Sequence, residues 1–245
     1  MEKTLLNKIK KEAIRIDWEV TFNGNTKGNH HLERVNKIAK HLAKEENANL
    51  ELSQAGAWLH DVALSTGSDY DLDNSKKVAK QILKQLEVKI PEERRIVMEC
   101  IISHEGVKQP TCLEAKVVHD ADVLDKLGVL GFIRHTVKLT NLGWIKPGDI
   151  RRSKVKEMVD HLHWRETNLK LKESKRLAKF LRLKGSRKEI YFQAEVLINT
   201  ISPLAKEGVL TEKIAKIIAS KLKPQWRDVL DKQLNLDYLK NLIII

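Results

Sequence analysis

One short segment constrains this chain more than any other, because a histidine and an aspartate stand side by side in the apolar run of residues 55–63. Burying a carboxylate without a partner costs several kcal/mol, so His60 and Asp61 need a hydrogen-bond network or a metal ion around them. The small residues at 55–57 would let another helix approach this segment closely. We therefore expect residues 55–63 to lie buried, against a second helix and beside a polar network or a cation.

The rest of the chain indicates an all-α fold. Its 245 residues include only five Pro and 11 Gly, and we find neither an alternating strand pattern nor an internal repeat. Proline and glycine residues mark the expected helix ends. The predicted helices cover residues 2–20, 28–46, 50–63, 73–86, 91–104, 112–139, 151–184, 187–205, 210–222 and 235–243.

The sequence also favours a soluble, cytoplasmic protein. Cys100 and Cys112 are the only cysteines and form no CxxC pair, which argues against a disulfide framework or a thiolate zinc site. The N-terminus has no apolar core of signal-peptide length, and no run reaches the roughly 20 apolar residues of a membrane span. We expect no membrane association.

Helical phase selects His31 as an inward-pointing histidine. Val35, Ile38 and Leu42 follow it at spacings of four, seven and eleven, so His31 heads an apolar face, whereas His30 heads a polar one. A single inward histidine is more often a satisfied core residue than a ligand. The ligand interpretation therefore depends on what other residues accompany it.

Asp122 is a further candidate ligand. It shares a helix face with Val118, Asp125 and Val129, and two carboxylates on an apolar face are hard to explain as surface charge. One of them would bind a cation while the other supports a ligand or a neighbouring helix. Asp120 is less well placed by phase.

The order of the candidate ligands resembles the H…HD…D signature of the HD-domain metal-dependent phosphohydrolases, with His31 first, then the pair His60–Asp61, then Asp122. The flanks agree, since His-Leu-Glu-Arg-Val from His31 is similar to the family's H-x-x-R-V and Trp-Leu-His-Asp-Val from Trp58 resembles L-L-H-D-I. The resemblance covers residues 25–140 and is closest to small stand-alone members that hydrolyse nucleotides.

This resemblance implies a helical bundle in which His31, His60, Asp61 and Asp122 hold one divalent ion. Two imidazoles and two carboxylates suit Mn²⁺, Fe²⁺, Co²⁺, Ni²⁺ or Mg²⁺, which would polarise a phosphoryl group and activate water. Asp61 would also orient that water, with His104 as the candidate acid.

Other candidate roles remain open at the level of sequence. His104 closes an apolar helix face and is equally well read as a core histidine. Arg34, one turn from His31, either contacts substrate or pairs with a carboxylate, and the structural role is favoured. Asp125 is expected to support the ligands, and Lys126 is the positive charge nearest the motif.

Departures from the family pattern favour one ion over two. Two-metal relatives carry extra histidines before the last aspartate, whereas only His104 and His119 lie between Val62 and Asp122 here. Asp71 occupies a position where relatives often show histidine, so a bridge to a second ion stays open. The family's lysine after the HD pair and its arginine before the last Leu-Asp are both missing, which leaves the cation that neutralises phosphate undefined.

A basic region follows the motif. Between Arg151 and Lys188, 14 Lys and Arg residues face four acidic ones. Such an excess attracts nucleotides or nucleic acid, although a solvated helix face explains it equally well. The five tryptophans are too dispersed to predict a base-stacking platform.

We therefore predict a phosphohydrolase acting on a nucleotide or a related small phosphate ester. The alternative is an HD-type nuclease or nucleic-acid-binding protein that uses residues 151–188. An HD-fold diiron oxygenase is disfavoured because histidines are scarce between Val62 and Asp122.

Two domains are expected: residues 1–185 as the catalytic bundle, including the basic helical region 151–185, and residues 186–245 as a helical extension packed on it. The stretch Gly143 to Asp149 is the best candidate for an exposed loop. The apolar end from Leu242 to Ile245 suggests docking on the body of the protein or on a second copy in a homodimer.

Overall fold

The fold was obtained as a computed structural model that describes residues 1–24, 26–148 and 150–239. Across these residues the chain forms α-helices joined by turns and short 3₁₀ or π segments, and no strand. The predicted all-α class is confirmed. No helix in the described ranges is both long enough and apolar enough to cross a bilayer.

The chain divides into two compact units. The first unit comprises Met1–Asp122 and Lys170–Ser174, and the second unit comprises Val123–Leu169 and Lys175–Ile245. The boundary predicted at residue 185 falls within the second unit and stays a prediction about domain organisation.

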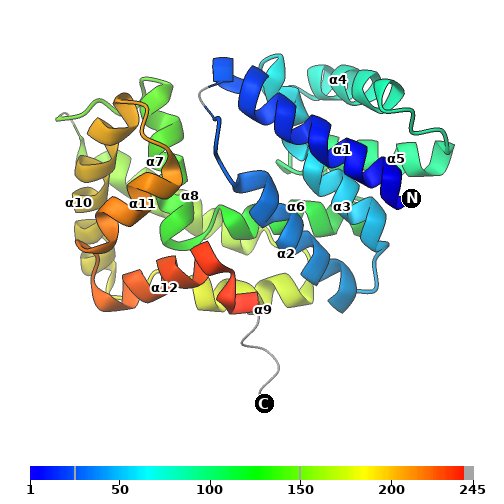
Figure 1. The fold of residues 1–245 in the computed structure, drawn as a ribbon. Helices are drawn as coiled ribbons and strands as arrows, with labels where there is room; N and C mark the ends of the chain where they lie inside the picture. Colours follow the sequence, from blue (N-terminus) through cyan, green and yellow to red (C-terminus); the bar gives the residue numbers. More distant parts are fainter. Residues whose placement is uncertain (25, 149, 240–245) are drawn as a thin grey trace. The chain divides into compact units, whose positions relative to one another are not determined.

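In the first unit, α3 is the central helix and packs against α1, α2 and α5. The close approach predicted for residues 55–57 is confirmed, because a Cβ added to Gly56 would lie 2.5 Å from the Cβ of Cys100 on α5. The helices of this unit are α1 (Lys3–Arg15), α2 (His31–Glu45), α3 (Leu50–Leu59), α4 (Leu72–Gln85), α5 (Pro91–Ser103) and most of α6 (Leu113–Asp125) (Figure 1).

In the second unit, α7 is central and packs against α8, α10, α11 and α12 around an apolar core that includes Phe132, Leu197 and Trp226. The helices that lie wholly or mainly in this unit are α7 (Gly128–Asn141), α8 (Arg152–Thr167), α9 (Lys172–Leu181), α10 (Arg187–Lys206), α11 (Thr211–Ala219) and α12 (Pro224–Asn235).

The single helix predicted over residues 112–139 is wrong, since the chain breaks between α6 and α7. Gly128 has a positive φ of 60°, and a Cβ there would lie 2.8 Å from the carbonyl oxygen of Leu181. The Gln233 side chain stabilises the break by donating to the Leu127 carbonyl at 2.8 Å and accepting from the Leu130 N–H at 3.0 Å. A partner a hundred residues away thus interrupts a continuous helical pattern.

The single helix predicted over residues 151–184 is also wrong. The Asp120 carboxylate, fully buried, accepts the backbone N–H groups of Lys170 at 3.0 Å and of Leu171 at 2.7 Å, in the gap between α8 and α9. These N–H groups are then unavailable for a helix running through the gap, which accounts for the break. Asp120, discounted as a ligand by phase, therefore has a clear structural role.

The C-terminal prediction misplaces a helix. Residues 224–235 form α12, with Pro224 in its first turn, whereas the helix predicted over 235–243 is replaced by a 3₁₀ turn at Asp237–Leu239. Pro at a helix start supplies the right φ and lacks only an N–H that would be unpaired there. The rest of that prediction, and the apolar end from Leu242 to Ile245, lie outside the described residues.

Candidate metal centre

The motif residues come from three segments of the first unit. His31 is the first residue of α2, and its backbone N–H donates to the Asn29 side-chain oxygen at 3.1 Å. His60 and Asp61 open the 3₁₀ turn that follows α3, and Asp122 lies in the last turn of α6. The two histidines and Asp122 are at most 2% exposed, so the helix faces chosen by phase are correct.

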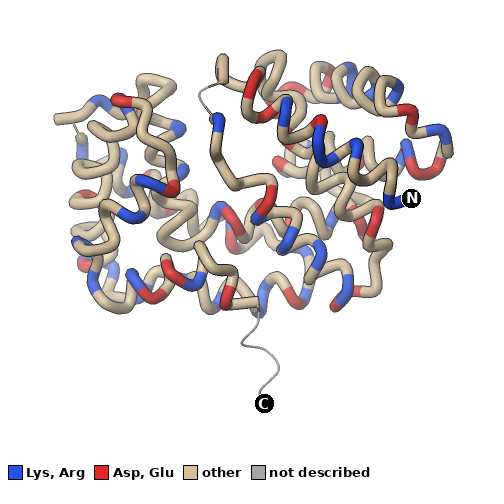
Figure 2. The backbone as a smooth tube through the Cα atoms, in the orientation of Figure 1, with Lys and Arg blue, Asp and Glu red and all other residues tan. Residues whose placement is uncertain are grey.

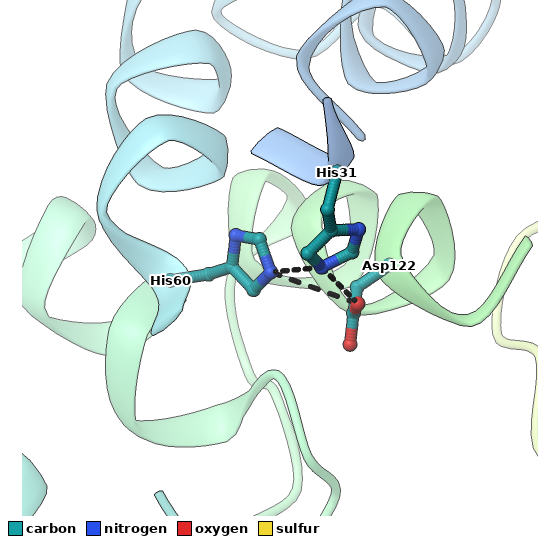
Figure 3. Close-up of side chains that lie close together, drawn as sticks. All are labelled: His31, His60 and Asp122. Atoms are coloured by element: carbon teal, nitrogen blue, oxygen red, sulfur yellow. Dashed lines mark hydrogen bonds and ion pairs between the residues drawn. The ribbon is translucent and has the colours of Figure 1, made fainter. Parts of the chain in front are cut away.

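The side chains of His31, His60 and Asp122 converge on one point (Figure 3). The Nε2 atoms of His31 and His60 lie 3.2 Å apart, and Asp122 Oδ1 is 3.3 Å from the first and 3.6 Å from the second. Asp61 completes the set, with Oδ2 3.3 Å from His31 Nε2 and Oδ1 3.4 Å from His60 Nε2.

A backbone hydrogen bond orients His60 toward this point. Its Nδ1 lies 2.8 Å from the carbonyl oxygen of Ala57, and because a carbonyl only accepts, Nδ1 carries the proton. In the neutral imidazole the lone pair then belongs to Nε2, which faces His31 and Asp122. A ligating histidine is normally held by this kind of bond at its other nitrogen.

The pKa values of His60 and Asp61 show that the two carboxylates favour a positive charge beside them. Burial acts to lower the pKa of His60, but Asp61 and Asp122 outweigh it and raise the pKa to about 9. Burial acts to raise the pKa of Asp61, but the surrounding histidines hold it well below its usual range. Without a cation the imidazoles must take up the compensating charge themselves.

The donor set fits a divalent transition ion or Mg²⁺. Ligand atoms that each lie about 2.0–2.2 Å from one ion are about 3–3.5 Å from one another, close to the separations found between these four residues. Two imidazole nitrogens and two carboxylates are also the ligands expected for such ions. His31, His60 and Asp122 form a buried group able to hold a metal, with Asp61 beside it.

A second group of potential ligands shares Asp61. His104 Nε2 lies 3.4 Å from Asp61 Oδ1 and 3.7 Å from Asp69 Oδ2, and these three residues form another group within ligand distance. Sequence reasoning missed Asp69 and selected Asp71, whose carboxylate instead caps α4 by accepting the N–H groups of Asp73 and Asn74, each at 3.0 Å. Asp69 is buried whereas Asp71 is exposed, and the sequence of the loop does not reveal this difference.

The remaining predicted residues are Arg34, Asp125 and Lys126. Arg34 is buried on α2, one turn from His31. Asp125, also buried, accepts a hydrogen bond from Arg134 Nη1 at 2.6 Å within the second unit. The Lys126 carbonyl accepts from Arg165 at 3.4 Å. Their roles in supporting the metal ligands or in binding substrate stay predictions.

A pocket opens beside Asp61. It is a small cavity between the C-terminal part of α1, the following π segment Ile16–Val20 and the turn that carries Asp61, and Asp61 is the one motif residue in its lining. Its walls are mostly apolar. The lining residues are Ala13, Ile16, Asp17, Thr21, Leu32, Trp58, Asp61 and Val62.

Comparison with known families places this geometry in context. Residues 29–127 match the family model of the HD domain, a segment that contains all four motif residues. Ribonuclease Y of Treponema denticola is 32% identical over 94 residues, which cover 38% of this chain and 17% of that protein. Ribonuclease Y of Finegoldia magna is 30% identical over 95 residues, with the same two coverages. The chain thus matches less than a fifth of the length of these relatives.

Solved structures share the fold over most of the chain. A Lactobacillus plantarum protein is 26% identical with a TM-score of 0.53, covering 80% of this chain and 96% of that one. Bacillus subtilis YpgQ, crystallised with ADP, is 19% identical with a TM-score of 0.55, covering 79% and 92%. At such identities the likeness to YpgQ establishes the fold alone.

Proposed function

Because the chain contains an HD domain at residues 29–127, we propose that it is a metal-dependent phosphohydrolase acting on a nucleotide or a related small phosphate ester. The observation that carries the proposal is the convergence of two imidazoles and two carboxylates on one point. Nucleotides come first among candidate substrates because YpgQ, which shares the fold, was crystallised with ADP.

In this proposal, His31, His60, Asp61 and Asp122 hold one divalent ion. When bound, such an ion polarises a phosphoryl oxygen and lowers the pKa of a coordinated water. Asp61 has an additional task, because its carboxylate faces the pocket as well as the imidazoles. We assign it the orientation of the attacking water.

His104 is the proposed proton donor. Its Nδ1 donates to the Ile101 carbonyl at 2.7 Å, so Nε2 is the atom that exchanges a proton on the side of Asp61. In the reaction, the water oxygen bonds to phosphorus, the bond from phosphorus to the leaving oxygen breaks, and that oxygen takes the proton from His104 Nε2. The proton lost by the water restores His104 over the cycle.

The group of Asp61, Asp69 and His104 supports an alternative use of the same residues, as ligands of a second ion. We retain one ion, since it leaves His104 free to act as the acid. Metal titration decides between the two: saturation at one equivalent per chain supports the acid, and saturation at two supports the second ion.

A nuclease activity is the second candidate function. It is favoured by the similarity of about 95 residues of this chain to ribonuclease Y. The match covers too little of those proteins to transfer their activity, so RNA is included as a substrate to be tested.

The decisive experiment is a hydrolysis screen of the metal-loaded protein. Nucleoside mono-, di- and triphosphates, a chromogenic phosphate monoester, and single-stranded DNA and RNA are offered with each divalent ion in turn. Phosphate or pyrophosphate release from a mononucleotide, abolished by chelation and by Asp61→Ala, supports the proposal. Cleavage of RNA with no mononucleotide turnover would replace it with the nuclease.

A further inference from the structure

The second unit contains a stack of three aromatic rings. His135 on α7 stacks on His161 of α8 with ring centroids 4.9 Å apart and planes 21° apart. His161 stacks in turn on Trp164, with centroids 5.4 Å and planes 15° apart. Three nearly parallel rings thus run from the partly buried side of α7 out to the surface of α8.

The outer end of this stack faces solvent. Trp164 is 53% exposed although His161 covers one face of its ring. Exposing a large indole to water has no structural benefit, and most tryptophans in proteins are largely buried. A flat ring that ends a stack in this way is suited to receive another planar ring on its open face.

Positive charges act on His135, at the inner end of the stack. Burial lowers the pKa of His135 to about 3, helped by Arg165, His161, Lys138 and Lys126. The inner ring therefore stays neutral at physiological pH. A neutral π-stack among positive charges favours a ligand that combines a flat aromatic ring with negative charge.

A second exposed tryptophan lies toward the other end of α8. Trp144 is 63% exposed, and Lys154 places its ammonium 5.4 Å from the centre of the indole ring. Lys154 and His161 are seven residues apart, so they lie on one face of α8. At 1.5 Å per residue, the ten residues from Lys154 to Trp164 span about 15 Å along the axis of α8.

The surrounding charge is strongly positive. Within the second unit, the stretches 151–169 and 175–188 contain 12 Lys and Arg residues and three acidic residues. Two acids are directly neutralised by cations, Glu157 by Lys154 at 3.0 Å and Glu166 by Arg182, while Asp160 accepts from the Tyr191 hydroxyl at 3.4 Å. Lys and Arg, drawn blue in Figure 2, therefore outnumber the acidic residues four to one in these stretches.

We propose that the surface formed by α8 and the preceding loop, with Trp144, Lys154, His161 and Trp164, binds single-stranded nucleic acid, with bases stacked on the two exposed indoles. Aromatic rings that stack bases, set among cations that contact the phosphates, are the two components of sequence-tolerant single-strand sites. The sequence predicted no such platform, because the separation of Trp144 and Trp164 along the chain hides their common relation to α8.

This proposal does not depend on the phosphohydrolase, because every residue it uses belongs to the second unit. Binding is measured without added metal, by fluorescence anisotropy of a labelled 20-nucleotide oligo-dT. The His60→Ala protein should bind like the wild type. Failure of the metal chemistry and failure of the nucleic-acid site are thereby separated.

Two matched pairs of variants test the surface. Trp164→Leu keeps an apolar side chain but loses the ring face, and it should weaken binding about 5- to 150-fold, while Trp164→Phe should retain most of the affinity. Lys154→Glu should weaken binding more than Lys216→Glu, because Lys154 lies over the Trp144 ring within the proposed face, whereas Lys216 is an exposed lysine on α11. Binding by the wild type should fall steeply with salt.

Four outcomes would overturn the proposal. If wild type and Trp164→Leu bound oligo-dT with equal affinity, the surface would be a nonspecific polyanion patch. The same would follow if each protein bound heparin as tightly as oligo-dT. Competition by thymidine monophosphate as effective as that by the oligonucleotide would make the stack a mononucleotide site. Loss of binding in Trp164→Phe as complete as in Trp164→Leu would exclude stacking.

Discussion

The two units use the same side chain in opposite ways. In the metal centre the imidazoles meet edge to face, with planes 79° apart for His31 and His60 and 76° for His60 and His104. In the second unit the planes of His135 and His161 differ by only 21°. The first arrangement points ring nitrogens at a common centre, and the second presents ring faces to a neighbour.

The charges around each site account for the difference. Burial lowers the pKa of both His60 and His135, but two carboxylates raise that of His60 to about 9, whereas cations help to bring that of His135 to about 3. A buried histidine next to carboxylates becomes a ligand or a proton carrier. A partly buried histidine among cations becomes a neutral aromatic surface.

The largest expected effect is on metal binding. His60→Ala removes a ligand from a four-residue set, so we expect the purified variant to lose both its divalent ion and its hydrolytic activity, as measured by elemental analysis and turnover. Asp71→Ala is the matched control: it removes the cap of α4, worth about 0.5–2 kcal/mol of stability, and should retain the metal. Equal metal content in wild type and His60→Ala would refute the assigned centre.

The next effect concerns proton transfer. His104→Ala should lower turnover by roughly 10²–10⁴-fold, the usual effect of a lost general acid, without changing the metal content. Asp69→Asn should have a smaller effect, since it alters a neighbour 3.7 Å from His104 Nε2 and leaves the donor in place. Unchanged turnover in His104→Ala would return this histidine to a packing role.

Much of the metal centre could be predicted from sequence, because helical phase alone places His31 and Asp122 inward. Phase depends only on residues within a few turns, and those are visible in the sequence. Asp69 could not be predicted this way, since it lies in a loop where no periodicity indicates burial. The choice of Asp71 followed from its spacing to Ser75, a spacing that a helix cap satisfies equally well.

The helix breaks were missed for a related reason. Gln233 reaches Leu127 and Leu130, and Asp120 reaches Lys170 and Leu171, across 50 or more residues of sequence. Helix propensity is local and cannot report a distant polar side chain that takes up backbone groups. The base-stacking face was missed in the same way, as its rings meet only when α7 and α8 pack.

A moderate effect is expected where helices α3 and α5 touch. In Gly56→Ala, the new methyl would lie 2.5 Å from Cys100 Cβ and 2.7 Å from its Sγ, so we expect a loss of about 1–3 kcal/mol in the free energy of unfolding, measured with denaturant. The exchange Gly56→Ala with Cys100→Gly removes both contacts. It should be less destabilised than the sum of the two single variants, and simple additivity would show that this contact does not limit packing.

The smallest effect tests the electrostatic contrast between the two units. Because burial and nearby cations lower the pKa of His135 from 6.5 to about 3, the unfolded chain binds a proton at this residue more readily than the folded chain between these pH values. Stability therefore falls as the pH decreases through this window.

The variant His135→Phe keeps a stacking ring but cannot titrate. Between pH 7 and pH 5, the wild type should lose up to about 2 kcal/mol more unfolding free energy than this variant, at 1.36 kcal/mol per pH unit below 6.5. All other titrating groups are common to both proteins, so the difference isolates His135. Identical pH dependence would mean that the ring is hydrated and outside the stack, and a difference of opposite sign would mean that a carboxylate neighbours it, as in the metal centre.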